Sequence, residues 1–137
     1  MPVQTTLPFI LNEHTSRVIA WQFQDADATG VNNNALLSVT LTLYDLETDA
    51  IINSRNAQDV LGGSHTGQNN VTIDTSGNAI WYMQPEDNDI IGTSIPEGGY
   101  ETHIALFVWT WDPGDGEGVR ENNMEVSLLV KNLHRIP

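Results

Sequence analysis

One uninterrupted run of strand-forming residues, Tyr100–Trp111, constrains the fold more than any other part of the sequence. Because side chains alternate between the two faces of a strand, the run has one aliphatic face and one aromatic face. Its central side chains are Ile104, Leu106 and Val108 on the first face and Phe107, Trp109 and Trp111 on the second. Two apolar faces indicate a strand that is covered on both sides, or covered on one side and placed against a protein neighbour on the other.

Shorter strand patterns recur along the rest of the chain. They cover Arg17–Gln24, Ala35–Asp45, Ala50–Ser54, Val71–Asp74, Ala79–Met83 and Met124–Leu133. Turn-forming residues separate these segments, and no stretch shows the period of an amphipathic helix. The sequence therefore predicts an all-β protein, an immunoglobulin-like antiparallel β-sandwich of about seven or eight strands. Gly98-Gly99-Tyr100 resembles the tyrosine corner of such folds, and Trp21 is predicted to be a core anchor.

The chain divides into an N-terminal arm or edge strand over residues 1–16 and the sandwich over residues 17–137. Pro8 cannot donate to a strand ladder, which favours an edge or an extended arm packed on its own domain or on a neighbouring subunit. Apolar anchors carry most interface energy, so the apolar side chains of the arm are the predicted contact residues. They are Leu7, Phe9, Ile10 and Leu11. Trp109 and Trp111, or Phe107, form a second candidate contact patch, with burial in the core as the alternative.

Composition excludes several classes of function. The chain has no cysteine, which excludes disulfides, thiolate zinc sites and cysteine nucleophiles. Its 18 acidic and 5 basic residues give a formal charge of −13, which argues against nucleic acid and anionic membranes as partners. Such a charge is consistent with solubility, a basic protein partner or bound cations. Neither a signal peptide nor a run of ~18 apolar residues is visible, so we expect no membrane partner.

No motif in the sequence predicts an enzyme or a cofactor. Ser64 and His65 are adjacent in a Gly-rich loop, which does not hold a nucleophile and its base in reach of each other. His103 lies two residues after Glu101 and is interpreted as a satisfied histidine, with an imidazole held by Glu101 as the alternative.

One acidic loop has the composition of a cation site. The weak candidates for calcium ligands are Asp112, Asp115 and Glu117. Pro113 and Gly114 displace the second acid of the EF-hand pattern, so we expect no metal ion.

Five segments together resemble small immunoglobulin-like structural proteins of tailed bacteriophages. They read VIAWQFQDADATG, LLSVTLTLYDLETDAIINSRNAQDV, NNVTIDTSGNAIWYMQPEDNDI, ETHIALFVWTW and MEVSLLVKNL. The resemblance implies a non-enzymatic virion protein, made in the host cytoplasm, that acts as a capsid decoration or cement protein or as a head–tail connector. A tail or baseplate component is also compatible. It further implies a homo-oligomer whose partners are major capsid, portal or connector, or tail proteins.

A carbohydrate-binding β-sandwich module, in a phage tail or baseplate or for attachment to a host surface, is the alternative function. Its binding platform would use aromatic side chains beside Asn-rich loops. The candidates for the platform are Trp81, Tyr82, Trp109 and Trp111. A hydrolase with an acidic pair is a third hypothesis, but no motif supports the paired carboxylates that it needs.

Overall fold

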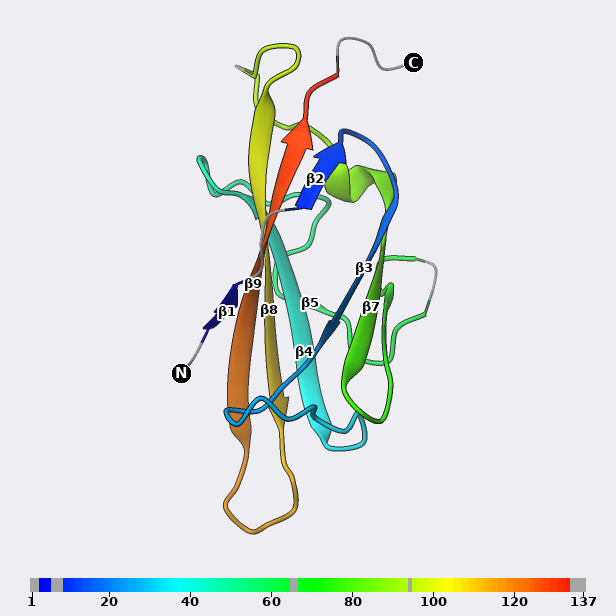
Figure 1. Ribbon diagram of the computed structural model, residues 1–137, viewed down its shortest axis with the longest axis vertical. Helices are drawn as coiled ribbons and strands as arrows, with labels where there is room; N and C mark the ends of the chain where they lie inside the picture. The colour runs from blue at the N-terminus through cyan, green and yellow to red at the C-terminus, as the bar shows by residue number, and fades with distance from the viewer. Residues whose placement is uncertain (1–2, 6–8, 65–66, 94, 134–137) are drawn as a thin grey trace.

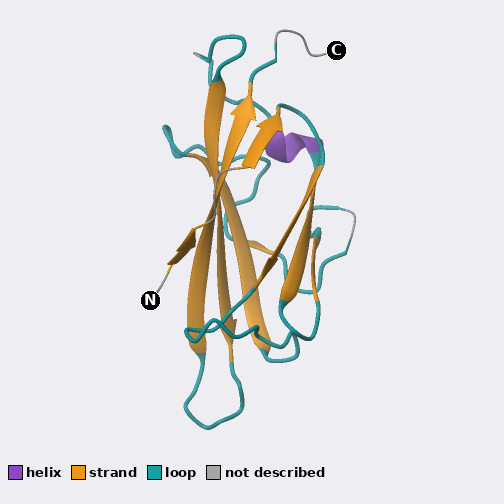
Figure 2. Cartoon of the chain, in the orientation of Figure 1, coloured by secondary structure: helices purple, strands orange, loops and turns teal. Residues whose placement is uncertain are grey.

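Two β-sheets face each other in the computed structural model, which describes residues 3–5, 9–64, 67–93 and 95–133 (Figures 1 and 2). The larger sheet has six strands, and the smaller sheet has three in the order β3-β7-β6. The prediction of an all-β sandwich is confirmed.

The predicted long strand is the centre of the larger sheet. This sheet contains β1 (Val3–Thr5), β2 (Phe9–Asn12), β4 (Leu36–Asp45), β5 (Gln58–Asp59), β8 (Tyr100–Trp111) and β9 (Arg120–Lys131). The smaller sheet contains β3 (Arg17–Gln22), β6 (Val71–Ile73) and β7 (Asn78–Met83), and η1 (Pro85–Asn88) is a 3₁₀ turn. β8 pairs antiparallel with β9 on one side and β4 on the other, so its residues define the register of the sheet.

Most strand bounds differ from the sequence prediction by one or two residues, and two segments differ by more. β9 begins four residues earlier than expected, because its pairing with β8 continues as far as Trp111 opposite Arg120. The predicted strand Ala50–Ser54 is wrong. Asn53 and Ser54 have φ angles of 52° and 58°, which no extended strand accommodates. Only an isolated bridge to β4 forms there, and the short strand β5 lies in the segment that was predicted as a loop.

The described parts of the N-terminal segment lie along the outer edge of β9. β1 and β2 both pair with β9 in parallel, with Val3 opposite Asn123 and Phe9 opposite Leu128. The backbone of this segment therefore pairs with its own domain. Glu13 extends this contact, because its amide donates to the carbonyl of Lys131 at 3.0 Å.

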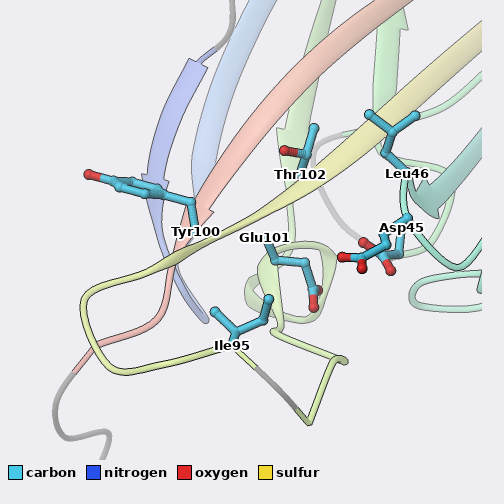
Figure 3. Close-up of a pocket in the computed structure, with 7 residues that line it drawn as sticks. Asp45, Leu46, Ile95, Tyr100, Glu101 and Thr102 are labelled. Carbon is cyan, nitrogen blue, oxygen red and sulfur yellow. The ribbon is translucent and has the colours of Figure 1, made fainter.

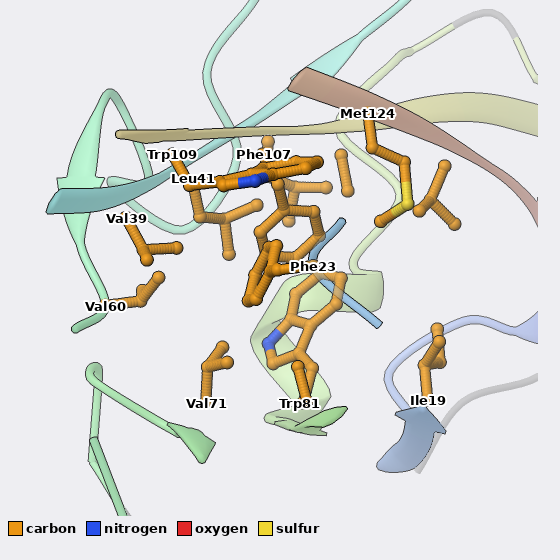
Figure 4. Close-up of a cluster of buried hydrophobic side chains, with 14 of the residues drawn as sticks. Ile19, Phe23, Val39, Leu41, Val60, Val71, Trp81, Phe107, Trp109 and Met124 are labelled. Carbon is orange, nitrogen blue, oxygen red and sulfur yellow. The ribbon is translucent and has the colours of Figure 1, made fainter. Parts of the chain in front are cut away.

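The core between the sheets contains aromatic rings in tilted and edge-on contacts (Figure 4). Phe107 of β8 lies 4.5 Å from the Trp21 ring and 5.7 Å from the Trp81 ring, measured between centroids. Phe23 packs against Trp109 at 4.8 Å. These contacts join β8 to the smaller sheet, as the aromatic face of the run at Tyr100–Trp111 requires.

Candidate functional site

The predicted contact residues of the N-terminal segment have different environments. Ile10 is 61% exposed, whereas Leu11 is buried in the core at 4%. Phe9 is half-buried beneath the guanidinium of Arg17, which lies 5.2 Å from the ring centroid. Leu7 lies outside the described residues. Only Ile10 of the three described side chains is therefore an open apolar surface, and the interface role of the segment stays a prediction.

The prediction of a second contact patch at Trp109 and Trp111 is wrong. Trp109 is fully buried and Trp111 is 5% exposed, and Phe107, the other residue of that patch, is also fully buried. The indole nitrogen of Trp109 donates to the backbone oxygen of Gln24 at 3.1 Å, which satisfies its polar end inside the core. The tyrosine-corner resemblance also fails, because Tyr100 is exposed at the start of β8 and does not fill a corner.

Glu101 and His103 form a buried pair on the inward face of β8. The Nε2 atom of His103 lies 2.6 Å from Glu101 Oε1, and both side chains are almost fully enclosed. The backbone amides of Ile91 and Gly92 donate to the same carboxylate at 3.0 and 2.7 Å. The imidazole is thus held by Glu101, and the carboxylate fastens the loop before β8 to the sheet. Because both oxygens of Glu101 are hydrogen-bonded, we interpret the pair as a structural contact between β8 and the loop before it.

A second buried cluster, around Arg55, was missed by the sequence analysis. Its guanidinium donates five hydrogen bonds, to Asp87 (two), Gln58, the Gln68 carbonyl and Asn70. All five donors of the side chain are therefore satisfied. The only sequence signal was a lone arginine in a polar loop of a chain that has few bases. The cluster joins segments that are distant in sequence and contains no free group for catalysis.

The acidic loop between β8 and β9 holds its carboxylates in local contacts. Asp112 and Asp115 each accept a backbone amide two residues further along, from Gly114 and Glu117. Asp115 also binds Arg120 at 2.7 Å, and this hydrogen bond holds the pKa of the Asp115 carboxyl below its usual value. Among the described residues, no group of three or more acidic or histidine side chains is arranged to hold a metal ion.

A notch at the opposite end of β8 combines carboxylates with apolar side chains (Figure 3). It consists of two adjoining cavities of about 220 and 460 Å³. Both cavities are lined by Asp45, Glu47, Ile95 and Glu101. We call this feature the Asp45 notch. Asp45 lies there because it is the last residue of β4 and pairs with His103 of β8. Glu101 is two residues before His103 on the same strand.

The outward face of β8 points away from the smaller sheet, and its central side chains are buried or half-buried, with Ile104 only 5% exposed. It carries Ile104, Leu106 and Val108, the aliphatic face recognised in the sequence. Tyr44 on β4 lies opposite Ile104, and Glu125 on β9 lies opposite Leu106. Partial burial and the negative charge of Glu125 raise the pKa of the Tyr44 phenol. The face therefore has an apolar centre with an acidic margin, and we call it the outer β8 face.

No protein-family model matches the sequence, and no curated protein matches it. Within the described ranges, no helix is long and apolar enough to cross a membrane. The function is therefore inferred from two surfaces of the structure, the outer β8 face and the Asp45 notch.

Proposed function

We propose that this protein is a non-enzymatic structural component that works through protein–protein contacts. The resemblance of its segments to immunoglobulin-like phage proteins favours a virion role, as a capsid decoration or cement protein or as a head–tail connector. Its partners are then major capsid, portal or tail proteins, and the protein itself forms a homo-oligomer in the virion.

The observation that carries this proposal is the outer β8 face. Its central side chains are aliphatic, although the smaller sheet packs only on the aromatic side of the strand. Leu106 and Val108 are only half-buried within this chain, and a partner protein would complete the burial of this second apolar face. The outer β8 face is bordered by a long strand on each side, because β8 pairs with β4 and with β9.

The internal bonding of the polar clusters supports a function without catalysis. Both oxygens of the Glu101 carboxylate accept hydrogen bonds from their own chain, and all five donors of the Arg55 guanidinium are used. A general acid or a nucleophile needs an atom that reaches the substrate. Neither cluster offers one in the described residues, because the unpartnered Nδ1 atom of His103 is buried.

Light scattering tests the proposal directly. We expect the purified protein to form a defined oligomer, or to remain a monomer that loads onto purified tailed-phage capsid shells in a fixed ratio. Leu106→Lys places a charge in the centre of the outer β8 face and should abolish whichever association is seen. Val18→Lys is the matched control, because Val18 is 60% exposed on β3 of the other sheet.

The result that overturns the proposal is a wild-type monomer that ignores the shells. Equal loss of association in Leu106→Lys and Val18→Lys would likewise show that the outer β8 face is not the contact surface. A thermal melt of each variant by circular dichroism separates lost association from lost folding.

Carbohydrate binding, the alternative function, has no platform at the residues predicted for it. Trp81 and Trp109 are fully buried and Trp111 nearly so, and only Tyr82 is partly exposed. A sugar platform needs exposed ring faces. Carbohydrate binding therefore stays a prediction from the sequence, with no surface assigned to it.

A further inference from the structure

The Asp45 notch gathers exposed apolar side chains around buried carboxylates. Four of the eight large apolar residues that the described chain leaves exposed line its two cavities. They are Leu46, Ile51, Ile91 and Tyr100. Exposed apolar side chains that cluster around a concave site are typical of recognition surfaces, whereas single ones are ordinary.

One oxygen of Asp45 is left for a ligand. The side chain is only 4% exposed, and its Oδ2 atom accepts the amide and the hydroxyl of Thr48 at 3.2 and 2.6 Å. No described residue donates to Oδ1, although the carboxylate lines both cavities (Figure 3). This oxygen remains accessible from the notch, and a carboxylate that is largely removed from water favours a cationic partner.

The neighbouring groups add negative charge and no positive charge. Glu47 is exposed at the rim, and Glu101 lies in the lining with its oxygens bonded to Ile91, Gly92 and His103. Among the described residues that line the notch, none is lysine, arginine or histidine. The described lining of the notch therefore carries negative charge and contains no positively charged side chain to balance it.

The geometry selects an organic cation over a metal ion. Calcium takes six to eight oxygen ligands, and here both oxygens of Glu101 already accept hydrogen bonds, which leaves Asp45 and Glu47 as the other carboxylates. An ammonium or guanidinium group needs only one or two acceptors. Its aliphatic stem packs well on apolar surface such as Leu46 and Ile95.

We propose that the Asp45 notch binds a lysine or arginine side chain presented by an apolar segment of a partner protein. A second copy of this chain is a poor occupant of this notch, because the chain has only 5 lysine and arginine residues. Two of its bases are also engaged internally, Arg55 with Asp87 and Arg120 with Asp115. The notch is a different surface from the outer β8 face, so this inference stands or falls without the proposed virion role.

A titration with two tripeptides tests the inference. The ¹⁵N-labelled protein is titrated with acetyl-Leu-Lys-Leu-amide and with the same peptide in which norleucine replaces lysine. We expect the lysine peptide to shift the amide resonances of Leu46, Gly92 and Thr102 and to bind at least about tenfold more tightly. About 0.15 M salt screens attraction to the overall charge.

Variants locate the binding. Asp45→Asn keeps an oxygen for Thr48 and removes the charge, and we expect it to weaken the lysine peptide about tenfold. Glu47→Gln is an exposed second variant that should weaken binding too, and it serves if Asp45→Asn fails to fold. Asp27→Asn is the matched control, because it removes one exposed charge from a separate cavity that contains Trp111.

Three results would overturn the inference. These are equal affinity of the two peptides, an equal loss in the Asp27→Asn control, and resonance shifts that lie away from the notch. Leu106→Lys should leave peptide binding unchanged. A loss of shell loading with intact peptide binding, or the reverse, therefore tells the two proposals apart.

Discussion

Arg55 and Asp87 form an ion pair in which both side chains are completely shielded from solvent. The pair joins the loop after β4 to η1, and Arg55 also lies 5.7 Å from the Trp81 ring centroid. Asn53 and the Gln84 amide donate to the same Asp87 carboxylate at 2.8 Å each. One buried charge pair thus connects the loop after β4 to η1.

Replacing Arg55 with methionine should destabilise the protein strongly. The change removes the positive charge and leaves Asp87 buried without its partner, which typically costs about 3–5 kcal/mol. The free energy of unfolding from urea titrations measures the loss. Arg120→Met is the control, because it breaks an exposed pair with Asp115 and should change little. A loss below about 1 kcal/mol for Arg55→Met would show that the pair is not a structural centre.

Two glycines with the same backbone angle should respond differently to alanine. Gly77 and Gly114 have φ angles of 79° and 78°, a region that costs a residue with Cβ about 1–2 kcal/mol. A Cβ atom at Gly77 would also lie 2.7 Å from the backbone oxygens of Phe23 and Val31, whereas nothing lies within 4 Å at Gly114. Gly77→Ala should therefore lower the melting temperature clearly more than Gly114→Ala. Equal shifts would show that the backbone angle alone governs both sites.

Local pattern was sufficient to predict the main strands. β8 has the predicted bounds because Tyr100–Trp111 is dense in β-branched and aromatic residues and is limited by Gly and Pro. The alternation also separated the two faces of this strand correctly. It did not tell which face is the core, since both are apolar. The assignment of Trp109 to an exposed patch failed for that reason.

The Asp45 notch and the Arg55 cluster could not be predicted, because a single sequence does not show which distant residues come together. Asp45 and Glu101 line one notch only because β4 and β8 pair with Asp45 opposite His103. Arg55 meets Asp87 across 32 residues. Such pairings follow from the register of distant strands. Asn53, whose positive φ angle is incompatible with the predicted strand, also bonds to Asp87, 34 residues away.

Calcium should have no effect on the acidic loop after β8. The carboxylates of Asp112 and Asp115 are engaged by backbone amides, and Arg120 supplies the counter-charge to Asp115. The loop therefore leaves free far fewer than the six to eight oxygen ligands that calcium takes. Addition of about 5 mM calcium should leave the amide resonances of Gly114 and Glu117 in place. Saturable shifts at these amides, reversed by a chelator, would establish a site that the geometry argues against.

The contact between His14 and Asp89 should make the anchoring of β2 depend on pH. His14 Nδ1 lies 2.6 Å from Asp89 Oδ1, and the His14 amide donates to the Asn88 carbonyl at 2.8 Å. The hydrogen bond to Asp89 and its negative charge, with smaller contributions from Glu86 and Glu13, raise the pKa of His14 above its ordinary value of 6.5. A raised pKa in the folded state means that protonation favours folding.

The stabilising effect of the His14–Asp89 contact is therefore complete below the unfolded pKa and is lost as pH rises through the higher folded pKa. We expect the amide of Glu13 to exchange hydrogen faster at pH 8 than at pH 5.5, after correction for intrinsic rates. An NMR titration should give His14 a pKa above 6.5 that returns toward this value in Asp89→Asn. Asp74→Asn is the control, because Asp74 bonds only within the β6–β7 turn. An unshifted His14 in the wild type would mean that the contact is not formed in solution.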